Sequence, residues 1–226
     1  MQIRLESLGQ QAYALIRREI TEGRMKPGSR ILESDLVQGL GISRTPIREA
    51  LLKLEADGVV VLNRRRSYNV RVLTVDDVAE TYQILGILEG AAASSVVHKI
   101  TSQDVDLLKQ YNDQMKQMAR ESNHTGYGRW NQEFHNIFLC RFGNRTLREL
   151  CDSARQLIYI FPVGQTSMAE WLDVSAQQHD EIIRLVEAKK GKELGAYFRN
   201  VHWSYAKDRQ YIKDAFDTNG SGVIQP

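Results

Sequence analysis

The segment EITEGRMKPGSRILESDLVQGLGISRTPIREALLKLEADGVV, residues 19–60, decides the fold of this chain. Its second half predicts two helices joined by a tight turn at Gly41, the first of them around residues 33–40. Ser43 suits the N-cap of the following helix, where its hydroxyl would accept a hydrogen bond from a free backbone N–H of the first turn. Pro46 falls in that first turn, where its missing N–H costs little. The segment therefore predicts a helix-turn-helix.

The helix that follows Ser43 has two different faces. Apolar residues recur at helical spacing from Ile47 to Leu54 and predict the face that packs on the rest of the domain. Arg44 and Arg48 lie on the opposite face, near the N-terminal end, which is the end of a recognition helix that contacts bases. An arginine fork can donate to O6 and N7 of one guanine together. The candidate DNA contacts of this helix are Ser43, Arg44, Thr45 and Arg48.

The flanking segments complete a winged helix-turn-helix. Upstream, residues 8–22 predict an amphipathic helix. Downstream, residues 59–62 and 67–72 predict the two strands of a hairpin, with alternate side chains from Tyr68 to Val72 pointing inward. A basic hairpin tip after a recognition helix is typical of a wing that contacts phosphates or a minor groove, and the alternative is a solvated turn. The tip carries Arg64, Arg65 and Arg66.

The same segment closely resembles the GntR family of bacterial regulators, with matches that continue without a gap. The resemblance implies a homodimer that binds a short palindromic operator in double-stranded DNA through the four helix residues named above. The wing departs from the family, whose members often have a glycine near the tip, and the arginines found here strengthen attraction to phosphates. The matching residues are Gly23, Pro27, Gly28, Leu32, Leu36, Gly41, Ser43, Arg44, Thr45, Pro46, Arg48, Glu49, Ala50, Leu51, Leu54, Gly58 and Val59.

Composition and charge describe an ordinary globular chain with an uneven charge distribution. Of 226 residues, 42% are hydrophobic and 26% are charged, and no apolar run approaches the ~20 residues that span a bilayer. The N-terminus lacks a signal pattern, so we expect a cytoplasmic protein with no membrane association. Residues 1–73 hold 13 Lys/Arg and 8 Asp/Glu and the rest holds 17 and 20, so the net charge changes from +5 to −3. Cys140 and Cys151 fit a reducing compartment and predict no disulfide framework.

Strand patterns stop at Thr74, and we expect a domain boundary between residues 1–73 and 74–226. The second domain predicts an all-α bundle of about six helices, which makes the whole protein mainly α. The capping-box pattern at Thr74 begins the first of these helices. Residues 122–126 predict a loop and residues 217–222 a mobile tail. The expected helices are 75–98, 102–120, 128–142, 145–161, 168–188 and 190–214.

The chemistry of the second domain lies in its histidines. Asn131 and His135 are four residues apart, so they share one helix face. His179 and His202 fall on two later helices, and imidazoles from three helices can converge inside a bundle. Neutral imidazole is a ligand for zinc, nickel, copper or iron. From spacing alone, buried histidines with satisfied hydrogen bonds are the more common alternative.

The second domain resembles the FadR-type ligand-binding domain called FCD. The resemblance is carried by Asn131-x-x-Phe134-His135, by Gln178-His179-Asp180-x-Ile182 and by the late His202. Many FCD domains hold a divalent metal through an aspartate and three histidines, which implies a site made of Asn131, His135, His179 and His202 with zinc or nickel as the favoured metal. Asn131 stands where the family has aspartate, and an amide oxygen brings no negative charge, so we expect a lower affinity.

In FCD proteins the metal often lies beside a pocket for a small carboxylate. Several members hold that carboxylate with an arginine four residues before a helix-one glutamate. Glu89 matches the glutamate, but Leu85 stands at the arginine position, which argues against a standard acid pocket. Arg155 and Tyr159 are therefore the candidate effector contacts, and the alternative is a surface arginine and a packing tyrosine.

The leading hypothesis is a ligand-responsive transcriptional regulator and not an enzyme. A small molecule, expected to be a carboxylate or related metabolite, would change operator binding only if it binds two domain arrangements with different affinity. One alternative is a metal sensor in which the metal itself is the signal. Another is a metal-dependent hydrolase, which also needs a placed general base, and Glu133 lies on the wrong helix face for that role.

Overall fold

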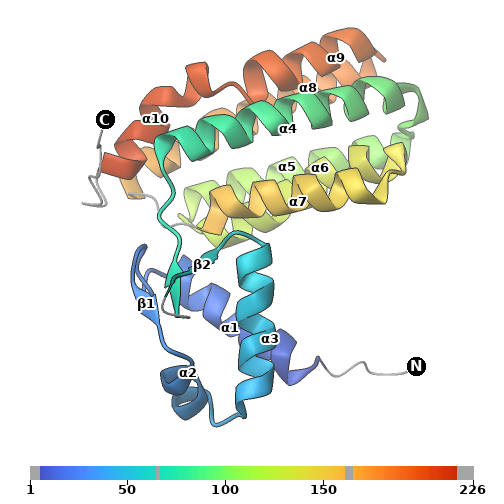
Figure 1. Cartoon of the computed structure of the whole chain (residues 1–226). Coiled ribbons are helices and arrows are strands. Elements are labelled where there is room, and N and C mark those ends of the chain that lie inside the picture. Colours follow the sequence, from blue (N-terminus) through green and yellow to red (C-terminus); the bar gives the residue numbers. More distant parts are fainter. Residues whose placement is uncertain (1–5, 65–66, 161–164, 218–226) are drawn as a thin grey trace. The chain divides into compact units, whose positions relative to one another are not determined.

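The computed structural model describes residues 6–64, 67–160 and 165–217. The chain forms two compact units, and the N-terminal segment that makes most of the first unit ends at Leu73 (Figure 1). The first unit combines helices with a small sheet, and the described residues of the second form helices joined by short turns. The prediction of a mainly α protein with an N-terminal winged helix-turn-helix and a C-terminal helical bundle is confirmed.

Three helices make the core of the first unit; the first two lie within one residue of their predicted bounds, and the third begins directly after its predicted N-cap, Ser43. They are α1 (Leu8–Thr21), α2 (Glu33–Leu40) and α3 (Arg44–Ala56). A capping box formed by Ser7 and Gln10 begins α1 and satisfies backbone N–H groups there. The apolar faces of α1 and α3 pack on each other. Their buried residues are Ala12, Ile16, Ile20, Ile47, Ala50, Leu51 and Leu54.

The sheet of the first unit has a strand that the sequence patterns did not predict. β1 (Arg30–Ile31), β2 (Val60–Leu62) and β3 (Tyr68–Val70) pair antiparallel in the order β1-β3-β2. The prediction that alternate side chains up to Val72 point inward is wrong at Val72, which is 43% exposed. Strand pairing ends at Val70, so the alternation of faces no longer applies beyond it.

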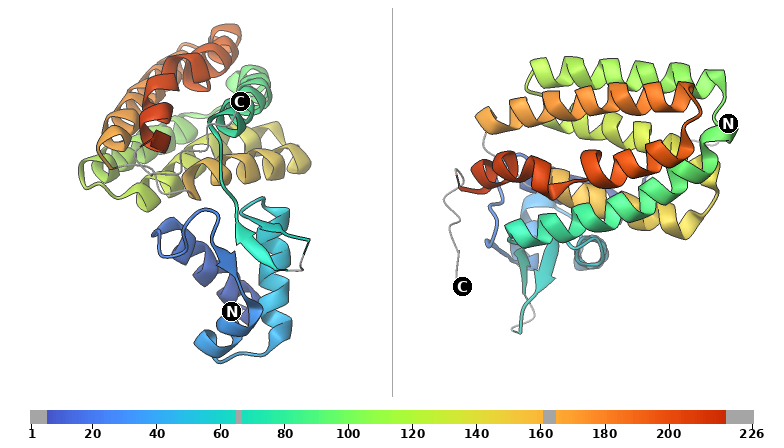
Figure 2. Two further views of the ribbon diagram at one scale, coloured as in Figure 1. Left: turned by 60° about the vertical axis from the view of Figure 1, so that its left-hand side comes forward. Right: turned by 90° about the horizontal axis from the view of Figure 1, so that it is seen from above.

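The second unit is a bundle in which long helices run alongside one another (Figure 2). Neighbouring pairs include α4 with α9 and α5 with α8. Capping boxes at Thr74 and Thr101 begin the first two helices, as the Thr74 pattern predicted. The helices are α4 (Val75–Val96), α5 (Ser102–Arg120), α6 (His124–Phe142), α7 (Arg145–Ile160), α8 (Gln165–Glu187), α9 (Gly191–Tyr197) and α10 (Tyr205–Asp217), with a short 3-10 turn, η1 (Val97–Lys99), after α4.

The loop predicted at residues 122–126 is shorter in the structure. α6 begins at His124, because the Asn123 side chain accepts a hydrogen bond from the Gly126 N–H and caps the helix earlier than expected. The tail prediction concerns residues beyond Asp217, which lie outside the described part of the chain.

The prediction of a single helix over residues 190–214 is wrong. A π-helical turn, η2 (Phe198–His202), interrupts this segment between α9 and α10. The Trp203 N–H donates to the Phe198 carbonyl at 2.8 Å, which is a bond one residue longer than in an α-helix. The interruption raises the number of helices above the expected six. It also lets the adjacent residues His202 and Trp203 both be buried, at 4% and 5% exposure.

Small residues bring α4 close to α9 and η2. A Cβ added at Gly90 would lie 2.8 Å from the Gly195 carbonyl oxygen, and one at Gly86 would lie 3.2 Å from the Arg199 Cα. Only glycine permits this backbone approach. This close crossing places Glu89 on α4 beside Trp203, the residue that follows η2, and Trp203 Nε1 donates to Glu89 Oε2. No helix in the described ranges combines the length and apolar character needed to cross a membrane.

Asp208 on α10 gives the bundle a pH-dependent contact. It is 4% exposed, and it accepts from Trp171 Nε1 at 3.3 Å. Burial raises the pKa of Asp208 from 3.8 to about 6, although hydrogen bonds from Trp171 and Tyr82 oppose this. The native state therefore holds the proton of the Asp208 carboxyl group more tightly than the unfolded chain does. The contribution of the protonated carboxyl group to stability is complete below about pH 4 and is lost as the pH rises through about 6.

We expect Asp208→Asn, which cannot ionise, to be more stable than the wild type at neutral pH by up to about 3 kcal/mol. Thermal denaturation at a series of pH values from about 4 to about 8 measures this. The gap between the two melting temperatures should widen as the pH rises. A gap that stays constant across the series would show that Asp208 does not release its proton in this range.

Candidate DNA-binding surface and candidate metal centre

The predicted DNA contacts of α3 lie together on its outer face. Ser43, Arg44, Thr45 and Arg48 are all exposed. Ser43 has the backbone conformation of an N-cap, but its side chain makes no capping hydrogen bond, so that detail of the prediction is wrong. At an exposed helix start, water can satisfy the free N–H groups instead.

The arginines of this surface differ in their partners. Arg48 Nε donates to the Glu33 carboxylate of α2 at 2.9 Å, which leaves the terminal nitrogens of its fork for other acceptors. Arg44 has no ion-pair partner among the described residues. In the wing, Arg64 is exposed, whereas Arg65 and Arg66 lie outside the described residues. The surface therefore presents cations at both the recognition helix and the wing.

Three histidines from three elements of the second unit converge in the bundle interior. His135 on α6, His179 on α8 and His202 on η2 are buried, and we call them the histidine cluster. The Nε2 atom of His135 lies 3.3 Å from that of His179 and 3.2 Å from that of His202. Their potential ligand atoms all lie within 4.8 Å of one another. The convergence that the spacing allowed and the FCD resemblance implied is present.

The surroundings of the cluster orient its lone pairs. His135 Nδ1 lies 2.6 Å from a Glu89 oxygen, and His202 Nδ1 lies 2.9 Å from Gln178 Oε1. Both partners offer oxygen atoms, so the two imidazoles can carry their protons on Nδ1 and turn a bare Nε2 toward the cluster centre. In that protonation state the three histidines could hold a metal ion.

The histidines of the cluster are neutral. Burial, together with the neighbouring imidazoles, holds the pKa of His179 and His202 well below the ordinary value. Burial lowers the pKa of His135 as well, although Glu89 acts in the opposite direction. Neutral imidazole is the form that ligates metal ions.

Asn131 lies one helical turn before His135 and is 1% exposed. Neither its Oδ1 nor its Nδ2 has a hydrogen-bond partner among the described residues. A buried amide without partners is costly, and a divalent metal would satisfy its oxygen. The histidine cluster could hold such a metal, and Asn131 is the candidate for a fourth ligand.

The sequence did not reveal how Glu89 and Arg155 pair. Arg155 is 1% exposed, and its Nη1 lies 3.1 Å from Glu89 Oε1, while Trp203 Nε1 donates to Glu89 Oε2 at 2.9 Å. Burial disfavours the Glu89 carboxylate, yet His135, Arg155 and Trp203 outweigh burial and lower its pKa. The sequence signal that could have pointed to this buried pair was Glu89 itself, a single glutamate in an otherwise apolar stretch of α4.

Of the two predicted effector contacts, the structure describes the side chain of Arg155 but not that of Tyr159. Arg155 is no surface arginine, because Asp152 and Asn136 bind its Nη2 at 2.5 and 3.0 Å in addition to its contact with Glu89. The side chain of Tyr159 lies outside the described residues. Leu85, at the position where family members have an arginine, is completely buried.

A winged helix-turn-helix followed by a helical domain with a buried polar site defines a DNA-binding transcriptional regulator with an effector-binding domain. Comparison with family models agrees: residues 8–70 match the bacterial regulatory proteins of the gntR family, and residues 80–201 match the FCD domain. The chain belongs to the GntR family and to its FCD-containing group.

Relatives that cover almost the whole chain have the same character. The uncharacterized HTH-type transcriptional regulator YdhC of Bacillus subtilis is 29% identical over 92% of both chains. The HTH-type transcriptional repressor RspR of Escherichia coli is 22% identical over 93% of this chain and 94% of its own. The structure of E. coli McbR/YncC superposes with a TM-score of 0.67 at 18% identity, over 96% of this chain and 98% of its own, and supports the fold.

Proposed function

We propose that this regulator is a homodimer on a palindromic operator, and that a small carboxylate bound beside a divalent metal controls its affinity for DNA. Zinc or nickel is the favoured metal, with Asn131 and the histidine cluster as ligands. The single observation that carries the proposal is the convergence of buried Nε2 atoms at 3.2 and 3.3 Å. When bound, the metal supplies a Lewis-acidic centre that accepts an oxygen ligand.

The charge of the site favours an anionic effector. The ligands are three neutral imidazoles and one amide, so they leave the full charge of a divalent ion uncompensated. Glu89 lies next to His135, but the Arg155 guanidinium balances its charge. A carboxylate that completes the metal coordination would therefore neutralise charge inside a low-dielectric interior. In this proposal, Arg155 acts through Glu89 on the orientation of His135.

The two-fold symmetry of a homodimer would present two copies of α3 to two operator half-sites. Because the partner is the DNA of the cell, the proposed place of action is the cytoplasm. A hydrolase is less well supported, because Glu133 is exposed and Glu89 is held by the arginine, indole and imidazole groups that surround it.

Elemental mass spectrometry of protein purified without chelators tests the metal. We expect about one zinc or nickel per chain. Small carboxylates, titrated into the metal-loaded and the metal-stripped protein, should raise the melting temperature and change operator affinity only in the loaded form. Absence of metal would contradict the proposal and direct the search to neutral or apolar effectors. Metal that changes operator binding without any carboxylate would indicate a metal sensor.

A further inference from the structure

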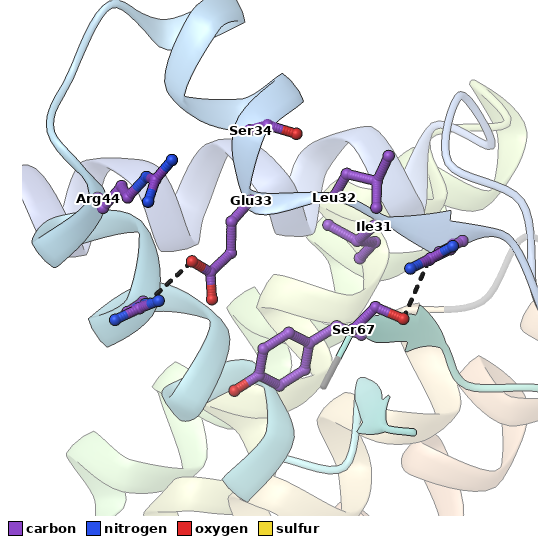
Figure 3. A pocket seen from close by; sticks show the side chains of 9 residues that line it. Ile31, Leu32, Glu33, Ser34, Arg44 and Ser67 are labelled. Atoms are coloured by element: carbon purple, nitrogen blue, oxygen red, sulfur yellow. Dashed lines mark hydrogen bonds and ion pairs between the residues drawn. The ribbon is translucent and has the colours of Figure 1, made fainter. Parts of the chain in front are cut away.

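A pocket of about 290 Å³ opens on the first unit between the recognition helix and the wing (Figure 3). We call it the arginine pocket, after the three arginines in its lining. Arg44 and Arg48 come from α3, whereas Arg30 comes from β1, the strand that the sequence patterns did not predict. Ser67 and Tyr68, at the base of the wing, form another side.

The arginine pocket is strongly positive. Its lining has three guanidinium groups and a single carboxylate, that of Glu33. Glu33 is already paired with Arg48 at 2.9 Å, so Arg30 and Arg44 remain without an ion-pair partner among the described residues. Two uncompensated guanidinium groups around one small pocket favour an anion with several oxygens.

Arg30 is held in position by the wing. Its Nε donates to Ser67 Oγ at 3.0 Å, and this serine is itself 7% exposed. Asn63 Nδ2 also donates to Ser67 Oγ, at 2.6 Å, which fixes the acceptor. One nitrogen of the guanidinium is therefore anchored, while its terminal nitrogens remain as donors at the pocket.

The location of the pocket indicates which anion it binds. A recognition helix enters the major groove, and a wing contacts the adjacent minor groove. One sugar-phosphate strand separates these two grooves. A pocket that lies between the helix and the wing faces that strand when both elements are engaged.

We propose that the arginine pocket binds one backbone phosphate of the operator, with Arg30 as its principal contact. This inference rests on DNA binding by the first unit and is independent of the proposed metal. The contact fixes the register of the protein on the duplex and does not discriminate between bases. Its loss should therefore lower affinity for every sequence by a similar factor.

The test uses the full chain and a duplex that the wild type selects from a random library, with a scrambled duplex of the same composition beside it. Arg30→Gln should make the slope of log affinity against log salt less steep by about 0.9 for each bound chain. The ratio of wild-type to variant affinity should therefore fall about 3.5-fold per chain between about 50 and 200 mM salt. The ratio of affinities for the two duplexes should stay unchanged. Arg30→Lys should retain most of the slope, and Arg18→Gln, an exposed arginine on α1, serves as the charge-matched control.

Single methylphosphonate substitutions, which neutralise one phosphate at a time, locate the contact. At one phosphate of each half-site, the substitution should lower the DNA affinity of the wild type several-fold. At the same phosphate it should hardly lower the affinity of Arg30→Gln, which has already lost the contact. Additive effects at every phosphate, or an unchanged salt slope, would overturn the proposal. A titration of inorganic phosphate, with chloride adjusted to keep the ionic strength constant, tests whether the pocket binds a free anion instead of a DNA phosphate. If inorganic phosphate binds only when Arg30 is present, and the methylphosphonate effects are additive, the proposal of a DNA-phosphate contact is also overturned.

Discussion

Arg48→Ala should bind DNA but lose most of its preference for the operator. Glu33 holds the Nε of Arg48 at 2.9 Å, and the terminal nitrogens of the fork remain free to donate to a guanine in the major groove. One good bidentate contact discriminates between bases by about 1–3 kcal/mol, and a dimer makes it twice, so specificity should fall by roughly 30-fold to 10⁴-fold.

The measurement is the ratio of affinities for the selected duplex and its scrambled counterpart at one salt concentration. Lys53→Ala removes a charge from the last turn of the same helix and should leave that ratio unchanged. The Arg48 side chain is 62% exposed, so its pair with Glu33 contributes little to folding, and the melting temperature should move only slightly. An unaltered specificity ratio would show that α3 is not the recognition helix or that Arg48 does not face the bases.

The first unit could be predicted closely because its signals are local. The apolar spacing of α1 and α3 and the turn at Gly41 act over a few residues. α1 and α2 begin and end within one residue of the prediction, and α3 begins directly after the predicted N-cap. β1 has only two residues, too few for any periodicity, and it exists because β3 pairs with it. The pocket that contains Arg30 was missed for the same reason.

The second unit shows the limit of local patterns. The three histidines could be predicted as a cluster because each falls on the inner face of a helix. The π-turn that positions His202 could not, since it depends on packing of η2 against α4 near Gly86. The Glu89–Arg155 pair joins α4 to α7, and no spacing rule connects residues so far apart in the chain.

The amide of Asn131 leads to the prediction with the most distinctive outcome. Asn131→Asp should be less stable than the wild type when the protein is stripped of metal, and more stable than the wild type when it is loaded with metal. In the stripped protein, the new carboxylate would be buried without a hydrogen-bond partner, as the amide is now, and should destabilise the fold by roughly 2–3 kcal/mol. In the loaded protein, the same charge would ligate a divalent ion directly and should tighten metal binding by about tenfold or more, since ligand charge tunes the affinity of a metal site.

Melting temperatures in a strong chelator and in excess zinc therefore decide whether Asn131 belongs to a metal site. We expect Asn131→Asp to melt below the wild type in chelator and above it in zinc, because ligand binding adds stability that grows with affinity. His179→Ala removes one ligand and should abolish the response to zinc, whereas His98→Ala, which removes an exposed histidine, should leave it intact. A variant that is destabilised equally under both conditions would mean that the Asn131 side chain does not reach the metal. The histidine cluster would then bind the ion without it, and the amide would need another partner.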